Sequence, residues 1–302
     1  MTDISTQSKG NGPGALVWLV GARGMLGQEV AAALRSRSIL HITTDLDCDI
    51  TCLDAVRAFA GEHRPDTILN CAAYTAVDRA EDEEEKAFAI NATGPRNLGL
   101  VASERGATVI HLSTDYVFDG RKTSPYVEDD PLAPQGAYGR SKVAGEAALH
   151  ETCPSSLVVR TAWLYGTKGP NFVETMLRLF ASREEVSVVD DQHGTPTYAP
   201  DLAAALVTIV CAESKAFGTY HYTNNGETTW FRFARRIHDR ARATGMLGRD
   251  CRLKAITTAE YPTRARRPAW SVLDKSKIAR AFGVVPRAWE DALDAYMAER
   301  SA

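Results

Sequence analysis

Short apolar segments alternate with helix-like segments along the first half of the chain. The apolar segments cover residues 15–20, 39–44, 67–73, 107–113 and 155–165. Between them stand stretches such as QEVAAALRS and LDAVRAFAGEH, in which apolar positions recur with a helical period. Strands that alternate with helices in this way form a parallel sheet covered on both faces. The pattern therefore predicts an α/β fold with a Rossmann-type doubly wound parallel sheet.

The pattern changes beyond about Gly166. Helix-like stretches there are interrupted by the turn DQHGTPT, which indicates a smaller mixed α/β substrate-binding lobe interleaved with the end of the first domain. We expect a flexible leader at 1–14. The dinucleotide-binding domain is predicted at 15–165 and about 195–225, and the lobe at about 166–194 and 226–302.

The composition is that of an ordinary globular protein. Of 302 residues, 44% are hydrophobic and 24% are charged, and the net charge is −3, which excludes disorder and any global attraction to nucleic acid or to an anionic membrane. No apolar run is long enough to span a bilayer, so we expect a cytoplasmic protein. The six cysteines form no C-x-x-C pair, so we expect reduced thiols rather than disulfides or a zinc site.

A glycine-rich turn follows the first predicted strand directly. Gly21, Gly24 and Gly27 have the spacing of a dinucleotide fingerprint, in which they permit a tight turn, a close approach of the backbone to the pyrophosphate, and packing of helix against strand. An ordinary strand-to-helix turn explains the three glycines as well.

Small side chains also follow the third strand, in the segment Asn70, Cys71, Ala72, Ala73 and Tyr74. A flat ring could lie against the sheet edge there. Ordinary core packing explains these small residues equally well.

Hydroxyl groups and an ammonium group follow the next strand. Thr114 stands at the end of an apolar run, and Tyr138 and Lys142 lie four residues apart, on one face of a predicted helix. An ammonium group close to a phenol lowers the phenol pKa toward neutrality, which makes Tyr138 a candidate general acid. Thr114 would hold the reacting carbonyl oxygen beside it. Chance is less able to explain the glycine turn, the Thr at the end of a later strand and the Tyr–Lys pair in this order than any one of them alone.

Taken together, these segments resemble the extended short-chain dehydrogenase/reductases, and among them the dTDP-4-dehydrorhamnose reductases. The likeness extends from Leu16 to Leu273. It rests on the segments GARGMLG (21–27), NCAAYTAVDRAE (70–81), STDYVFDG (113–120), YGRSKVAGE (138–146), RTAWLYG (160–166), NFVETML (171–177), DQHGTPT (191–197) and RRPAWSVLD (266–274). Trp270 departs from the family, where a smaller polar residue is common, and this puts the exact sugar in doubt.

The resemblance implies roles for individual residues. The catalytic set would be Thr114, Tyr138 and Lys142, with Thr114 and Asp115 contacting the sugar and Trp163 bordering the substrate. The implied cofactor contacts, together with those expected from the turns, are Gly21, Arg23, Gly24, Met25, Leu26, Gly27, Asp45, Asp49, Ile50, Cys71, Ala72, Ala73, Tyr74, Tyr138 and Lys142.

Two residues bear on the cofactor's phosphate. Arg23 in the glycine turn could pair with a 2′-phosphate, whereas Asp45 near the end of the second strand could accept a hydrogen bond from a free ribose hydroxyl and repel that phosphate. We favour NADPH, with NADH as the alternative. The resemblance also allows an interface Mg²⁺ ion to which Glu29, Glu184 and Glu185 could contribute, although nothing in their spacing requires it.

Basic residues in the second half are candidates for holding a diphosphate. Arg264 and Arg267, with Arg266 beside them, could clamp it, or the cluster could be a solvated loop. Asn171 could meet the nucleotide base or simply start a helix. The acidic run at 81–85 is interpreted as a solvated helix face.

The favoured function is the NADPH-dependent reduction of the C4 ketone of dTDP-4-dehydro-β-L-rhamnose to dTDP-β-L-rhamnose. One alternative is reduction of another nucleotide-activated 4-keto-6-deoxyhexose. A second alternative is a non-catalytic dinucleotide-binding regulatory subunit. The epimer produced is left open, as is the choice between a monomer and a homodimer.

Overall fold

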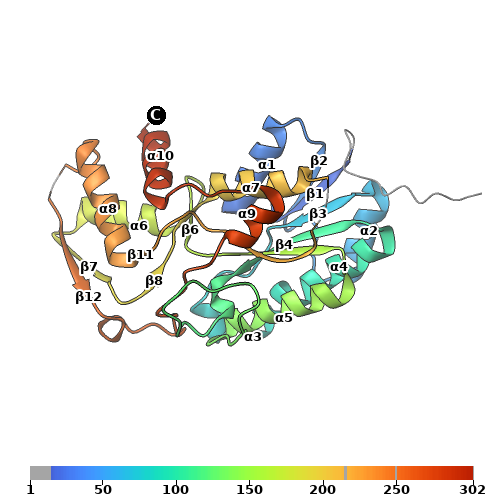
Figure 1. Ribbon diagram of the computed structural model, residues 1–302, viewed down its shortest axis with the longest axis horizontal. Helices are drawn as coiled ribbons and strands as arrows, with labels where there is room; N and C mark the ends of the chain where they lie inside the picture. The colour runs from blue at the N-terminus through green and yellow to red at the C-terminus, as the bar shows by residue number, and fades with distance from the viewer. Residues whose placement is uncertain (1–14, 214–215, 249, 302) are drawn as a thin grey trace, which may run out of the picture.

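The computed structural model describes residues 15–213, 216–248 and 250–301. The leader predicted at 1–14 lies outside the described residues. The described chain forms a sheet-containing domain and a smaller lobe beside it (Figure 1).

The larger domain is built on six parallel strands. Their order across the sheet is β2-β1-β3-β4-β5-β10. The strands are β1 (Val17–Val20), β2 (His41–Thr44), β3 (Thr67–Asn70), β4 (Thr108–Thr114), β5 (Ser156–Thr161) and β10 (Gly218–His221). The strand order reverses between β1 and β3, so the loops after these strands diverge at a switch point, the usual ligand position in such sheets.

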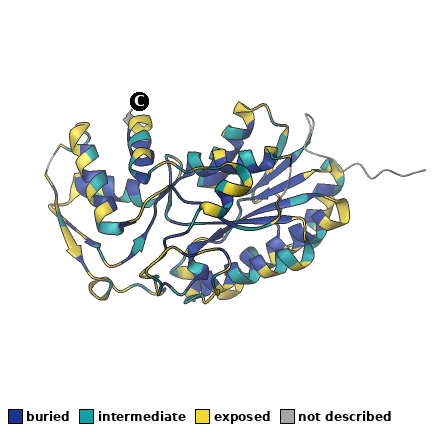
Figure 2. Ribbon diagram, in the orientation of Figure 1, coloured by how far each residue is buried: buried dark blue, intermediate teal, exposed yellow. Residues whose placement is uncertain are grey.

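Helices cover both faces of this sheet (Figure 1). One face carries α1 (Met25–Ser36), α7 (Ala199–Cys211) and α9 (Ser276–Phe282), and the other carries α2 (Leu53–His63), α4 (Gly94–Arg105) and α5 (Ala137–Thr152). Successive strand residues face opposite cores: Val17 and Leu19 pack under α1, whereas Trp18 and Val20 pack on the other side. Figure 2 shows the strands buried between helices whose outer faces are exposed. The predicted fold class is confirmed.

Short elements connect this framework. They are the 3₁₀ turns η1 (Arg79–Glu81), η3 (Asp115–Val117) and η4 (Thr258–Glu260), the helix α3 (Glu84–Phe88) and the π-helical turn η2 (Ala89–Thr93). Among the described residues, no helix is long and apolar enough to cross a bilayer. The six cysteines, all within the described residues, form no disulfide bonds.

The smaller lobe packs three helices against short strands. Its elements are α6 (Phe172–Ser182), α8 (Trp230–Ala243), α10 (Trp289–Ser301), the parallel pair β7 (Glu185–Val189) and β12 (Arg252–Ile256), and the two-residue strands β6 (Leu164–Tyr165), β8 (His193–Gly194), β9 (Thr197–Tyr198) and β11 (Thr228–Thr229). Phe180, Phe233 and Tyr296 form its core.

One segment departs from the predicted domain boundaries. The sequence pattern predicts about 226–302 as part of the lobe, but α9 returns to the larger domain, where Ile278 is buried in the core formed with α1 and α7. Phe282 packs edge-on against Tyr220 of β10. Burial of these two apolar side chains favours the return, which sequence periodicity alone does not reveal.

Candidate active site

The glycine turn after β1 is shaped by close backbone contacts. Gly21 has φ +76°, and a Cβ on it would lie 2.6 Å from the backbone nitrogen of Ala72. A Cβ on Gly27 would overlap the carbonyl of Gly21. Gly24 precedes α1, no side chain caps this helix end, and its first turn holds no acidic residue. The exposed amides are therefore suited to an anion, which fits the pyrophosphate of a dinucleotide.

The carboxylate of Asp45 is bound to the backbone of two turns. The Arg23 amide donates to Asp45 Oδ2 at 2.9 Å, and the Leu46 amide donates to Oδ1 at 3.0 Å. The Arg23 side chain is exposed. Asp45 thus fixes the glycine turn relative to β2. Its expected contact with a ribose hydroxyl stays a prediction.

The other expected cofactor residues lie along the same sheet edge. Asp49 accepts hydrogen bonds from the backbone and hydroxyl of Thr51, and Ile50 packs under Gly94 of α4. Cys71 follows β3 beside β1, where its amide bonds to Val20. Burial raises the pKa of its thiol, so the thiol is protonated and acts as a small apolar group.

Thr114 and Tyr138 meet at the end of β4. The Thr114 hydroxyl donates to Asp115 Oδ1 at 2.9 Å, and Thr114 also faces the phenol of Tyr138. Glu81 accepts a hydrogen bond from the Ala137 amide at 2.8 Å and so anchors the start of α5. Glu81 is itself exposed, as expected of the acidic run at 81–85, and this hydrogen bond adds a structural role.

Lys142 lies one helical turn beyond Tyr138 and is 1% exposed. Its Nζ donates to the Leu112 carbonyl at 2.6 Å and lies 3.2 Å from His111 Nε2. Burial lowers the pKa of Lys142 to about 8. Burial also raises the pKa of Tyr138, so the expectation that the ammonium lowers it is wrong for this structure. Desolvation of the phenolate dominates, and the phenol stays protonated, as a proton donor must be.

Asp115 is a buried carboxyl group beside these residues. It is 2% exposed, and burial raises its pKa to about 6 although the hydrogen bond from Thr114 opposes the rise. Its Oδ2 is a buried atom with no hydrogen-bond partner in the part of the chain that the structure describes. A buried polar atom of this kind is suited to a ligand hydroxyl.

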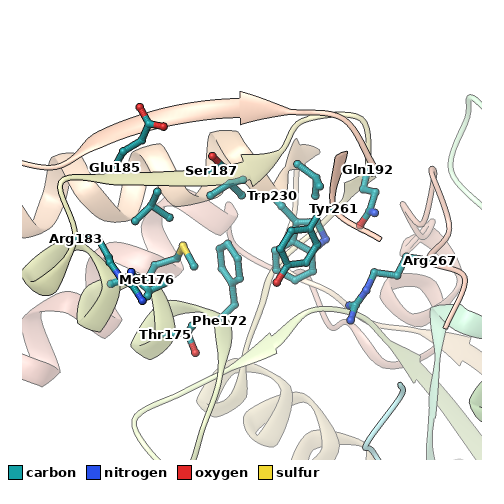
Figure 3. A pocket seen from close by; sticks show the side chains of 14 residues that line it. Phe172, Thr175, Met176, Arg183, Glu185, Ser187, Gln192, Trp230, Tyr261 and Arg267 are labelled. Carbon is teal, nitrogen blue, oxygen red and sulfur yellow. The ribbon is translucent and has the colours of Figure 1, made fainter. Parts of the chain in front are cut away.

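A pocket of about 550 Å³ opens in the smaller lobe between α6, β7 and α8 (Figure 3). Phe172, Trp230 and Tyr261 supply its aromatic surface, and Gln192 and Arg267 supply polar groups. Trp163 stacks on Trp230 with ring centroids 3.6 Å apart. Trp163 follows β5 and so contacts, through Trp230, a ring that lines the pocket. Its expected place beside the substrate stays a prediction.

The two expected clamp arginines differ in their surroundings. Arg267 lines the pocket and donates to Asp78 Oδ2 at 2.9 Å. The side chain of Arg264 is 66% exposed and pairs with Asp82 away from the pocket lining. For Arg264 the structure therefore supports the solvated-loop alternative.

Asn171 serves as the cap of α6. Its Oδ1 accepts from the Glu174 amide at 3.1 Å, and its Nδ2 donates to the Gly166 carbonyl at 2.7 Å. The structure thus places Asn171 in the helix-starting role, the alternative to a contact with the base, because both ends of its amide are used by the backbone.

The three glutamates considered for Mg²⁺ do not form one cluster. Among the described residues, no group of three or more metal-ligating side chains comes together. Glu29 belongs to α1, whereas Glu184 precedes β7 in the other lobe. Burial and the charge of Glu299 raise the pKa of Glu29.

Sequence reasoning missed several residues of the site. Trp230 and Tyr261 lie outside every segment that was singled out, and only the aromatic composition of the lobe points to them. Asp78 and His111 stand in or beside segments quoted for the resemblance, at positions that were given no role. Their partners are distant in sequence: Arg267 for Asp78, and Lys142 for His111.

Comparisons with known proteins agree with this geometry. A family model described as the RmlD substrate binding domain matches residues 16–301. The dTDP-4-dehydrorhamnose reductase of Streptomyces griseus is 45% identical over 91% of this chain and 91% of that protein. A dTDP-4-keto-6-deoxy-D-glucose reductase of Streptomyces niveus is 43% identical over 91% and 94% of the two chains. The crystal structure of dTDP-4-dehydrorhamnose reductase from Bacillus anthracis in complex with NADP has a TM-score of 0.88 and 37% identity, covering 94% of this chain and 99% of that one.

Proposed function

Because the chain belongs to the RmlD substrate-binding-domain family, that of the dTDP-4-dehydrorhamnose reductases, we propose that it reduces the C4 ketone of dTDP-4-dehydro-β-L-rhamnose to dTDP-β-L-rhamnose with NADPH. The observation that carries the proposal is the pairing of the Thr114 and Tyr138 hydroxyls at the end of β4. This pair lies at the same sheet edge as the glycine turn. Two hydroxyls at one point suit a carbonyl oxygen that becomes an alkoxide.

The nicotinamide cofactor, when bound, supplies the hydride that forms the new C4–H bond. Thr114 and Tyr138 hold the ketone oxygen, and Tyr138 gives its phenolic proton to that oxygen as the C–O π bond breaks. The product is the C4 alcohol. The raised pKa of Tyr138 keeps the proton on the phenol until the more basic alkoxide forms. Lys142 contributes positive charge below pH 8 and is proposed to hold the nicotinamide ribose.

Cofactor binding is assigned to the turn from Gly21 to Gly27, the segment Asp49 to Ile50 and the segment Cys71 to Tyr74. The free amides at the start of α1 receive the pyrophosphate. The exposed Arg23 is placed beside the 2′-phosphate, which favours NADPH. The NADP complex of the Bacillus anthracis relative supports this preference.

The substrate's nucleotide is assigned to the aromatic pocket, where Phe172 and Trp230 offer ring faces to a base. Arg267 is placed at the diphosphate, and the free Oδ2 of Asp115 at a sugar hydroxyl. Trp163 closes the side between the base and the sugar. We propose a cytoplasmic enzyme that acts as a monomer or homodimer.

A second candidate substrate is a different dTDP-4-keto-6-deoxy sugar. The name of the Streptomyces niveus relative and the bulky Trp270 favour it. Oxidation of NADPH, followed at 340 nm with a panel of nucleotide 4-keto sugars, separates the candidates. Faster turnover of dTDP-4-dehydro-β-L-rhamnose than of the other sugars supports the proposal. No turnover with any dTDP-4-keto sugar overturns it.

A further inference from the structure

Two buried polar side chains, Asn70 and His111, form a chain of close polar contacts that ends at the proposed catalytic Lys142. Asn70 and His111 are register partners on β3 and β4, and both are 0% exposed. The Asn70 Nδ2 atom lies 3.0 Å from His111 Nδ1, and His111 Nε2 lies 3.2 Å from Lys142 Nζ. Neither Asn70 nor His111 has a part in the reaction as proposed above.

The backbone fixes which way the Asn70 amide faces. The Ala72 amide donates to Asn70 Oδ1 at 3.0 Å, and a backbone N–H cannot become an acceptor. The Asn70 NH₂ group must therefore face His111. Because that group only donates, His111 Nδ1 has to accept.

The imidazole then has one place for its proton. His111 is fully buried, and burial holds its pKa well below the ordinary value, so the ring is neutral. With Nδ1 accepting, the proton is on Nε2, which faces Lys142. An Nε2–H can donate to an amine, which has a lone pair, but not to an ammonium, which has none. The Leu112 carbonyl accepts from Nζ in either form.

We propose that Asn70 and His111 are positioning residues that favour the uncharged amine of Lys142, Asn70 by fixing the histidine tautomer and His111 by donating its Nε2–H to Nζ. The other groups facing Lys142 are Glu146 and Cys71. Glu146 favours the ammonium, but its carboxylate is already paired with Arg160 at 2.7 Å.

The consequence for catalysis rests on the proposed function. A positive Lys142 is needed beside Tyr138 and the cofactor, and this charge is lost as the pH rises through the pKa of about 8. Burial already brings this limit well below the ordinary lysine value of about 10.4, and the Asn70–His111 pair would lower it further by favouring the amine.

The tautomer can be read without any activity measurement. Protein labelled with ¹⁵N-histidine is examined by two-bond ¹H–¹⁵N correlation between pH 6 and 9, and the His111 signals are identified by their absence in His111→Gln. If that variant does not fold, substituting the other six histidines in turn identifies His111 by elimination. We expect a protonated Nε2 and an unprotonated Nδ1 throughout. A protonated Nδ1, or an imidazolium, overturns the proposal.

A variant that reverses the tautomer tests control of Lys142. In Asn70→Asp the new carboxylate still accepts the hydrogen bond from the Ala72 amide. It also accepts a hydrogen bond from His111 Nδ1–H, so the imidazole proton moves to Nδ1. His111 Nε2 then becomes an acceptor for the ammonium of Lys142. We expect the histidine spectrum to show Nδ1–H and the alkaline limb of kcat/KM to move up by about one pH unit or more. Asn97→Asp, a buried asparagine on α4, controls for a new buried carboxylate and should leave the limb in place.

The outcomes separate the two claims. If Asn70→Asp reverses the tautomer but leaves the alkaline limb of kcat/KM in place, the claim that His111 controls Lys142 is overturned. An equal shift of that limb in Asn97→Asp overturns the same claim. Absence of turnover with every nucleotide sugar contradicts the proposed function, while the spectrum of the wild-type protein still decides the tautomer. If Asn70→Asp does not fold, that same spectrum is the test.

Discussion

Arg267 of the smaller lobe donates a hydrogen bond to Asp78 of the larger domain, with 2.9 Å between Nη2 and Oδ2. The same carboxylate accepts from the Ala265 amide at 3.1 Å. Asp78 therefore holds both the backbone and the guanidinium of the segment that crosses between the lobes. Arg267 keeps further N–H donors for the pocket that it lines.

Arg267→Ala should raise KM for the nucleotide sugar about 10- to 100-fold, because a charge-assisted contact contributes roughly 1.5 to 3 kcal/mol. Arg264→Ala is the matched control, since its ion pair with Asp82 is exposed on both sides and such pairs contribute little. Separate titrations of cofactor and substrate into each variant make the comparison. Equal effects of the two substitutions, or an effect on NADPH affinity as large as on the sugar, would refute the assignment.

Arg23→Ala should weaken NADPH much more than NADH, because only NADPH carries a 2′-phosphate for the guanidinium to meet. The expected loss is about 1.5 to 3 kcal/mol of binding free energy for NADPH. The Arg23 amide, which bonds to Asp45, is retained in the variant, so the turn should persist. Calorimetric titration with both cofactors is the measurement, and equal losses would make Arg23 a structural turn residue.

Asp115→Asn should stabilise the protein at neutral pH. Burial raises the pKa of Asp115 from 3.8 to about 6. The protonated carboxyl therefore contributes its full stabilisation of the fold below pH 3.8, and this contribution is lost as the pH rises through about 6. Replacing the carboxyl by a neutral amide removes this loss, which is about 1 to 3 kcal/mol. Urea unfolding at pH 4 and pH 8 should show a gain for the variant at pH 8 that shrinks at pH 4. A variant less stable than the parent at pH 8 would contradict the burial argument.

Much of this molecule could be predicted from patterns that are local in sequence. The strand and helix alternation, the turn at Gly21 and the approach of Tyr138 to Thr114 depend on periodicity and on the rule that parallel strands end at one edge. The return of α9 and the ion pair of Asp78 with Arg267 could not be predicted, because each joins segments that are distant in sequence; Asp78 and Arg267 are almost 190 residues apart. The pKa of Tyr138 depends on burial, which motif spacing does not report.

The central claim is that Tyr138 delivers the proton at the end of β4, and Tyr138→Phe tests it most directly. The variant keeps the ring, which packs edge-on against Tyr116, and removes only the hydroxyl. In a rapid-mixing assay with dTDP-4-dehydrorhamnose and saturating NADPH, we expect hydride transfer to slow by about 10²- to 10⁴-fold, with NADPH affinity nearly unchanged. Hydride transfer at close to the parent rate would contradict the account.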